Sequence, residues 1–96
     1  MYTIAVTFQC FDQKREAFVA RVREDGIYNA ILQEDGCLCY DYYFSEKNPN
    51  EILLLERWAS KDHQQAHLTT PHMDAMRGFK DEYIASTVLK EIEEKE

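Results

Sequence analysis

Four segments of the chain show the residue pattern that is typical of β-strands. Each is rich in β-branched, aromatic or leucine side chains, and polar or turn-forming residues lie between them. The segments are residues 2–11, 37–45, 52–58 and 83–92. We therefore expect four strands, each of which presents alternate side chains to opposite faces of a sheet.

The spacing of apolar residues changes to that of helices in two other regions. From Asp12 onward, the buried stripe of a helix is expected at Phe18, Val19, Val22, Ile27, Ala30 and Ile31. Gly26 is expected to bend or interrupt this helix, and the segment 34–36 ends it with a glycine.

The second helical region follows residue 58. Ser60 is a candidate N-cap for a short helix over residues 61–69. Thr70 and Pro71 then suit the start of another helix, because proline is tolerated at the first helical position. The core-facing residues of this last helix are expected to be Met73, Met76 and Phe79.

The resulting order is β-α-β-β-α-β, which predicts a ferredoxin-like α+β fold. In this fold a four-stranded antiparallel sheet carries both helical segments on one face. We expect a single domain over residues 1–92 and a polar, frayed tail over 93–96.

The sheet is predicted to be apolar on both faces. In the third strand, Ile52, Leu54 and Trp58 alternate with Leu53 and Leu55. The second strand is predicted to place Leu38, Tyr40, Tyr42 and Phe44 on one face, and Cys37, Cys39 and Tyr43 on the other. Because the helices cover only one face, a homodimer that packs sheet against sheet is expected, with a cavity where the facing sheets diverge.

Composition and charge narrow the class of partner. The 96-residue chain carries 18 acidic and 11 basic residues, a net charge of −7, so nucleic acid and anionic membranes are not expected partners. No apolar run approaches the roughly 20 residues needed to cross a bilayer, and the N-terminal segment lacks the features of a signal peptide. A cytoplasmic protein with free thiols at Cys10, Cys37 and Cys39 is expected, since the C-x-C spacing is not that of redox or zinc motifs.

The residues that could carry chemistry gather between positions 56 and 72. His63 and His67 have the i, i+4 spacing of zinc helices, but Gln64 stands where a metalloprotease has its glutamate. No cysteine or aspartate with ligand spacing lies nearby, so a metal site is not expected.

The stretch "HLTTPHM" presents His67 and His72 on either side of a predicted helix junction. Either histidine could act as a general base or donate a hydrogen bond to a substrate, or could only satisfy backbone groups at the junction. Glu56 lies among leucines, so it requires water or a partner such as an arginine. Trp58, Tyr40 and Tyr42 either line a substrate cavity or belong to the core or interface.

The segment Glu34 to Met76 contains three recognisable motifs. They are Glu-x-Gly-Cys-Leu-x-Tyr entering the second strand, Glu-x-Trp closing the third, and Ala-His-Leu-x-(Thr/Ser)-Pro-His-Met at the helix junction. With these motifs the segment resembles the antibiotic biosynthesis monooxygenase family. The resemblance implies a dimeric α+β barrel and a pocket between sheet and helices, which Trp58, His67 and His72 line or border. Haem degradation is not implied, because the residues that haem-degrading relatives use are absent.

The resemblance implies a cofactor-independent monooxygenase of small quinol-like or aromatic molecules, which uses molecular oxygen. The catalytic candidates are His67, His72 and Glu56, and the substrate-binding candidates are Trp58, Tyr40 and Tyr42. A similar branch isomerises phosphorylated autoinducer-2, so an isomerase of a small hydroxycarbonyl is the alternative, with Arg57 or Lys61 as possible phosphate ligands. The third alternative is a non-catalytic dimeric module that binds a small ligand.

Overall fold

The computed structural model of the chain describes residues 1–93. The elements follow the predicted order, with each helical connection divided into two short helices. They are β1 (Tyr2–Cys10), α1 (Arg15–Glu24), α2 (Ile27–Leu32), β2 (Cys37–Phe44), β3 (Glu51–Trp58), α3 (Lys61–His67), α4 (Pro71–Lys80) and β4 (Ile84–Ile92). Apart from Glu93, the tail predicted over 93–96 lies outside the described residues.

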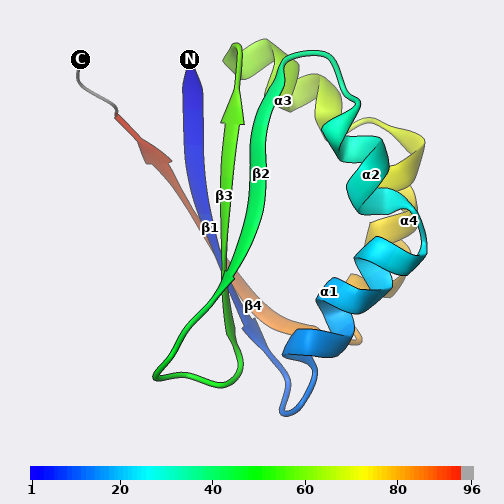
Figure 1. The fold of residues 1–96 in the computed structure, drawn as a ribbon, viewed down its shortest axis with the longest axis vertical. Coiled ribbons are helices and arrows are strands. Elements are labelled where there is room, and N and C mark those ends of the chain that lie inside the picture. Colours follow the sequence, from blue (N-terminus) through cyan, green and yellow to red (C-terminus); the bar gives the residue numbers. More distant parts are fainter. Residues whose placement is uncertain (94–96) are drawn as a thin grey trace.

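The four strands form one antiparallel sheet in the order β2-β3-β1-β4. All four helices lie on the same side of this sheet (Figure 1). The prediction of a ferredoxin-like α+β fold is confirmed, including the interruption at Gly26, whose φ of 76° separates α1 from α2.

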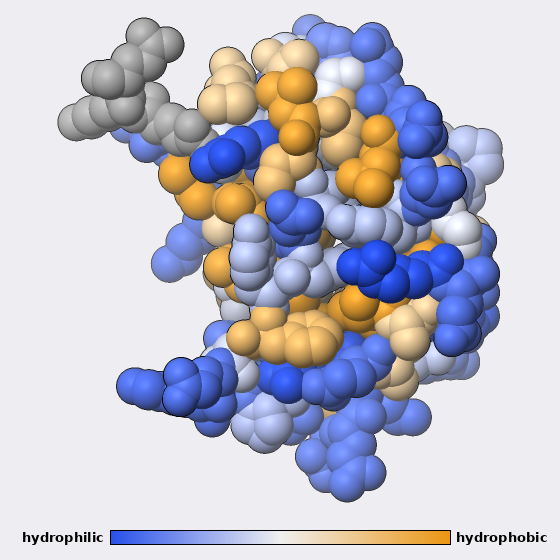
Figure 2. All heavy atoms as spheres, viewed as in Figure 1, coloured by the Kyte–Doolittle hydropathy of each residue, from blue (hydrophilic) through white to orange (hydrophobic). Residues whose placement is uncertain are grey.

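The core lies between the sheet and the helices. The predicted helix residues Phe18, Val22, Ile27 and Ile31 are buried there, as are Met73, Met76 and Phe79 of α4. The sheet contributes alternate residues of its central strands: Ile4, Val6 and Phe8 from β1, and Ile52, Leu54 and Trp58 from β3. Figure 2 shows hydrophilic residues along the outer side of the helical layer and hydrophobic ones over the strands and in the seam between the layers.

Two local expectations were wrong. The first helix begins at Arg15 with Lys14 at its N-cap, rather than at Asp12. In β2, the register shifts between Cys37 and Cys39, so the pairing skips Leu38. This bulge leaves Leu38 59% exposed and packs Cys37 against the core, which reverses the faces predicted for these two residues.

The sheet face opposite the helices is partly apolar, as predicted. The strand register aligns Tyr43, Leu53, Thr7 and Val88 in one row across all four strands. Three of these, Tyr43, Leu53 and Val88, are large exposed hydrophobic residues.

None of the helices described in residues 1–93 is both long and apolar enough to cross a membrane.

Gly36 is required where the α2–β2 loop passes under α3. Its φ is +79°, and a Cβ there would lie 2.4 Å from Cδ2 and 2.9 Å from Cβ of His63. Gly26 has a similar φ of +76°, but no heavy atom lies within 4 Å of a Cβ at that site. Alanine substitutions at the two glycines therefore distinguish the free-energy cost of a left-handed backbone from the cost of a steric clash.

We predict that Gly36→Ala lowers the free energy of unfolding by more than Gly26→Ala does. The left-handed conformation costs either alanine about 1 to 2 kcal/mol, and only Gly36→Ala must also displace the His63 ring. Urea denaturation of both variants checks this. Equal losses at the two positions would show that the His63 contact contributes nothing.

Candidate active site

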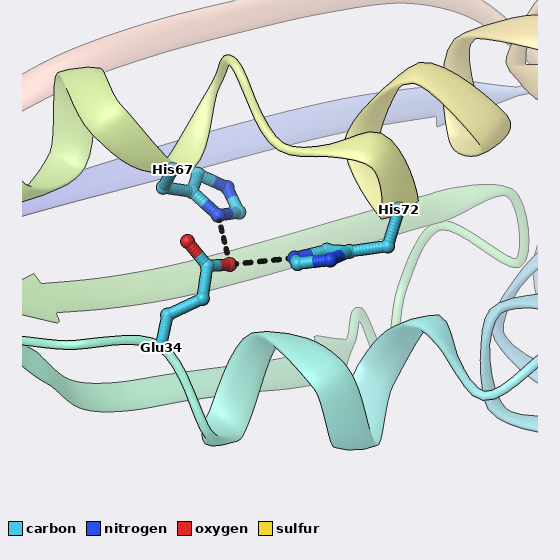
Figure 3. Close-up of side chains that lie close together, drawn as sticks. All are labelled: Glu34, His67 and His72. Carbon is cyan, nitrogen blue, oxygen red and sulfur yellow. Dashed lines mark hydrogen bonds and ion pairs between the residues drawn. The ribbon is translucent and has the colours of Figure 1, made fainter.

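Three side chains from two distant parts of the chain meet at the edge of the helical layer. Nδ1 of His67 lies 2.7 Å from Oε2 of Glu34, and Nε2 of His72 lies 2.8 Å from the same oxygen. In Figure 3, both rings point at one carboxylate oxygen, His67 from the end of α3 and His72 from the start of α4. The exposed fractions of the side chains are 2% for His67, 11% for Glu34 and 21% for His72.

The α3–α4 junction holds the two histidines in place. The Thr70 hydroxyl donates to the backbone oxygen of His67 at 2.9 Å, and the Thr69 hydroxyl donates to that of Ala66 at 2.8 Å. The same two carbonyl groups also accept hydrogen bonds from the backbone N–H groups of Thr69 and Thr70, so each is bonded twice at the end of α3. Pro71 then begins α4, as predicted, although Thr70 caps the helix by position without a side-chain bond.

The carboxylate of Glu34 decides which nitrogen of each ring carries a proton. An ionised carboxylate only accepts hydrogen bonds, so a neutral His67 must donate from Nδ1 and a neutral His72 from Nε2. In His67, this leaves Nε2 with a free lone pair, as a general base requires. Glu34 therefore orients and polarises His67 in the manner of the carboxylate in a catalytic triad.

A cavity of about 160 Å³ lies between the sheet and helices α3 and α4. Its walls are mostly apolar, and the polar residues in them are Glu56, Gln64, His67, Lys80 and Thr87. An engineered apolar cavity of about 150 Å³ holds one benzene molecule, so this cavity accommodates a single ring. A polar hollow of about 330 Å³ beside the paired ends of β1 and β4 is lined by none of the candidate site residues.

Glu56 faces the same cavity from β3. Its Oε1 accepts a hydrogen bond from the indole nitrogen of Trp58 at 3.0 Å, so within residues 1–93 its hydrogen-bond partner is the neighbouring tryptophan. Burial raises the pKa of Glu56 to about 7, although the bond from Trp58 favours the ionised form. A carboxyl group with such a pKa can accept or release a proton near neutral pH.

The His67 ring is packed between aromatic side chains. Its centre lies 4.7 Å from that of Trp58 and 5.8 Å from that of Tyr40. Burial lowers the pKa of His67, while the hydrogen bond and charge of Glu34 act in the opposite direction. The lowered pKa keeps the ring neutral at physiological pH, and the packing fixes its orientation.

The structure divides the sequence-based candidates into two groups. Tyr40, Glu56 and His67 line the cavity. Trp58 lies behind it, where it contacts both His67 and Glu56. Tyr42 is not among the lining residues and packs against Tyr40, Phe18 and Tyr28. His72 contacts the site through Glu34.

Sequence reasoning missed Glu34 and Lys80. The sequence places Glu34 at a helix end and at the start of the Glu-x-Gly-Cys-Leu-x-Tyr motif, but neither position predicts a chemical role for it. Lys80 is the cationic residue among the cavity-lining side chains, whereas the expected phosphate ligands lie elsewhere. Arg57 alternates with the inward-facing Glu56 and Trp58, and Lys61 is exposed beside Glu91.

His63 does not join His67, although both belong to α3. Its Nδ1 lies 2.7 Å from the Ser60 hydroxyl, and its Nε2 lies 3.3 Å from a carboxylate oxygen of Asp35. Ser60 also accepts a hydrogen bond from the His63 backbone and so caps α3, as predicted. The i, i+4 histidine pair considered in the sequence is therefore two separate sites.

Several solved structures share this fold over nearly the whole chain. PA3566 from Pseudomonas aeruginosa superposes with a TM-score of 0.86 at 17% identity, covering 99% of this chain and 94% of that one. Rv0793 from Mycobacterium tuberculosis gives 0.83 at 24% identity, covering 99% and 95%. The fold and the site together define a ferredoxin-like α+β protein with a carboxylate-held histidine at a ring-sized apolar cavity.

Comparison of sequences gives the family. Residues 1–78 match the model of the antibiotic biosynthesis monooxygenase family, to which this chain belongs. The chain is 37% identical over 57 residues to the "Probable quinol monooxygenase YgiN" of Escherichia coli K12, covering 51% of this chain and 55% of that protein. The chain thus spans about half the length of the curated relatives it matches.

We predict that the emission of Trp58 titrates with a midpoint near pH 7. Trp58 is the single tryptophan and donates its indole N–H to Glu56, so ionisation of that carboxyl changes its environment directly. A fluorescence titration from roughly pH 5 to 9 measures the midpoint. In Glu56→Gln the transition should be absent.

The raised pKa of Glu56 also fixes how the free energy of unfolding changes with pH. The pKa of Glu56 is raised from 4.5 to about 7, so the folded state binds more protons than the unfolded state between these values. Stability therefore falls as pH rises through this window, and Glu56→Gln removes that part of the slope. A wild-type slope equal to that of Glu56→Gln would contradict the assignment.

Proposed function

We propose that this protein is a cofactor-independent monooxygenase of small, single-ring quinol-like molecules. The observation that carries the proposal is the position of His67. Glu34 holds its Nδ1, and the ring lies in the wall of an apolar cavity the size of one aromatic ring. Membership of the family and the similarity to a probable quinol monooxygenase support the same class of reaction.

The reaction begins with removal of a proton from a substrate hydroxyl by Nε2 of His67. The product is an electron-rich substrate anion beside an imidazolium, which the Glu34 carboxylate stabilises. The anion then transfers electrons directly to O₂. The O–O bond and one ring carbon–hydrogen bond break. One oxygen atom forms a carbon–oxygen bond at that carbon, and the other leaves as water with the hydrogen from that carbon and the proton from the hydroxyl. The substrate supplies all the electrons that reduce O₂ and leaves as a hydroxylated quinone.

The other cavity residues bind and protect the intermediate. Tyr40 forms part of the cavity wall, and the aliphatic residues exclude water from the reacting anion. In its protonated form, Glu56 donates a hydrogen bond to a substrate oxygen. Trp58 is a positioning residue, since it holds Glu56 and packs against His67 without lining the cavity.

We predict that the protein consumes O₂ with a quinol of the right size, and that His67→Ala lowers kcat by about 10²-fold or more, the scale of general-base catalysis. Glu34→Gln should lower kcat by at least about tenfold with a smaller change in KM, because it removes the charge that fixes the His67 tautomer. His72→Ala should cost less than His67→Ala, because His72 acts only through Glu34. An oxygen electrode and a panel of one-ring quinols provide the measurement.

The matched control is His63→Ala, since His63 lies in the same helix but outside the cavity-lining residues. A loss of kcat in this variant equal to that in His67→Ala would contradict the assignment of the base. Tight binding of a ring compound without turnover, unaffected in rate by His67→Ala, would instead support the alternative of a non-catalytic ligand-binding module.

A second candidate function is isomerisation of a small phosphorylated hydroxycarbonyl compound. The specific observation in its favour is that Glu56, His67 and Lys80 line one cavity, which places two proton-transfer groups and a cation around one ligand. Absence of O₂ uptake, together with isomerase turnover that falls in Lys80→Met but not in the exposed-lysine control Lys61→Met, would replace the monooxygenase proposal with this one.

We propose that the protein is a homodimer formed through the sheet face opposite the helices. The row of Tyr43, Leu53, Thr7 and Val88 crosses this face, and its exposed large side chains favour burial against a second copy. In β3, the exposed Leu53 lies between the buried Ile52 and Leu54. Leu53 therefore points to the sheet face opposite the core.

We predict that Leu53→Glu shifts the molar mass in solution from dimer to monomer. In a two-fold interface each subunit carries the substitution, so two charged side chains would be buried against apolar surface. Leu32→Glu is the control, because Leu32 is a comparably exposed leucine at the end of α2. Light scattering after size-exclusion chromatography measures both variants. A monomeric wild type, or a dimer retained in Leu53→Glu, would contradict the proposed interface.

A further inference from the structure

The Glu34–His67–His72 cluster has the composition of an open metal site. Two histidines and one glutamate are a ligand set that binds zinc in hydrolytic enzymes, with the fourth position left for water. Here the three candidate ligand atoms all lie within 4.8 Å of one another. The side chains come from the α2–β2 loop and the α3–α4 junction, so folding, and not a short sequence motif, brings them together.

Rearrangement of the cluster around a bound ion requires side-chain movements on the order of one ångström. Any two ligand atoms around a tetrahedral zinc ion lie roughly 3.4 Å apart, given bonds of about 2.0 to 2.2 Å. The carboxylate oxygen now lies 2.7 and 2.8 Å from the two nitrogens, so it must move away by about 0.6 to 0.7 Å from each. The two nitrogens lie within 4.8 Å of one another and must close to the same spacing. Glu34 and His72 remain partly exposed, which gives an ion access from solvent.

We propose that this cluster binds a divalent transition-metal ion of the zinc type, and that the bound ion switches off the base at His67. A metal ion bound at Nδ1 of His67 replaces the proton through which this nitrogen now donates a hydrogen bond to Glu34. A neutral imidazole bound through Nδ1 carries its one proton on Nε2. The cavity then faces an N–H donor in place of a lone pair, and proton removal from a substrate hydroxyl stops.

The protons balance within the two rings. His67 moves its proton from Nδ1 to Nε2, and His72 moves its proton from Nε2 to Nδ1 as Nε2 becomes a ligand. The carboxylate of Glu34 keeps its charge and exchanges two hydrogen bonds for one metal bond. No oxidant or reductant is needed. The inhibitory consequence rests on the proposed monooxygenase function, whereas the binding site itself does not.

The test begins with binding of Zn²⁺ to the full chain by isothermal titration, with Co²⁺ as a probe whose visible absorption reports nitrogen and oxygen ligands. We expect one ion per chain, and an affinity roughly tenfold or more weaker in His72→Gln. His63→Gln is the matched control, because it removes a histidine that pairs with Ser60 and Asp35 instead. Equal affinity in wild type and His72→Gln overturns the proposal.

The three free cysteines require their own control, since thiolates also bind zinc. Binding that persists in His72→Gln but disappears after thiol alkylation places the ion on the cysteines and overturns the proposal. Binding that resists alkylation and shows nitrogen and oxygen ligation in the Co²⁺ spectrum supports it.

Oxygen uptake then tests the switch. Zn²⁺ should suppress uptake by the wild type, a chelator should restore it, and the ratio of uptake without and with Zn²⁺ should approach one in His72→Gln. Specific Zn²⁺ binding without inhibition of an active enzyme overturns the switch. If no quinol supports uptake, the binding experiment still decides the metal site, so failure of the proposed function and failure of the site are distinguishable.

Discussion

One carboxylate oxygen joins two parts of the chain that are far apart in the sequence. Oε2 of Glu34 accepts hydrogen bonds from His67 and His72, and so ties the α2–β2 loop to the α3–α4 junction. A partly buried carboxylate is costly without such partners, and two charge-assisted bonds offset that cost. The orientation of the His67 ring, its proton and the shape of the nearby cavity wall all depend on this contact.

A second carboxylate lies a short distance away in a different environment. Glu34 has two imidazole partners and remains at the edge of the fold, whereas Glu56 has one neutral indole partner and lies among apolar residues. Burial therefore brings the pKa of Glu56 to about 7. The two carboxyl groups consequently do different work: Glu34 orients the His67 ring, and Glu56 can exchange a proton near neutral pH.

The sequence was a better guide to the fold than to the site. Alternation in strands, the N-cap Ser60 and the helix-starting Pro71 are local signals, and each one corresponds to an element of the structure. The bulge at Leu38 was not predictable, because it arises from pairing with β3 and has no local signature. Glu34 was missed for a similar reason: its histidine partners lie 33 and 38 residues away, so no spacing rule connects them. The partner of Glu56 is only 2 residues away in the sequence. Trp58 was not predicted as that partner, because the bond depends on both side chains pointing to the same face of the sheet.

The pairing of β1 with β4 has a consequence for how the protein folds. Thr3 pairs with Ile92, so the sheet is complete only when segments near opposite ends of the domain meet. Contacts of such long sequence separation form slowly, because closing a large loop costs entropy before any bond is gained. Thr87 and Leu89 of β4 form part of the cavity wall, so the cavity is assembled with the slowest contacts of the fold. A molecule bound there therefore contacts the last strand and stabilises the folded state, in which that strand is paired.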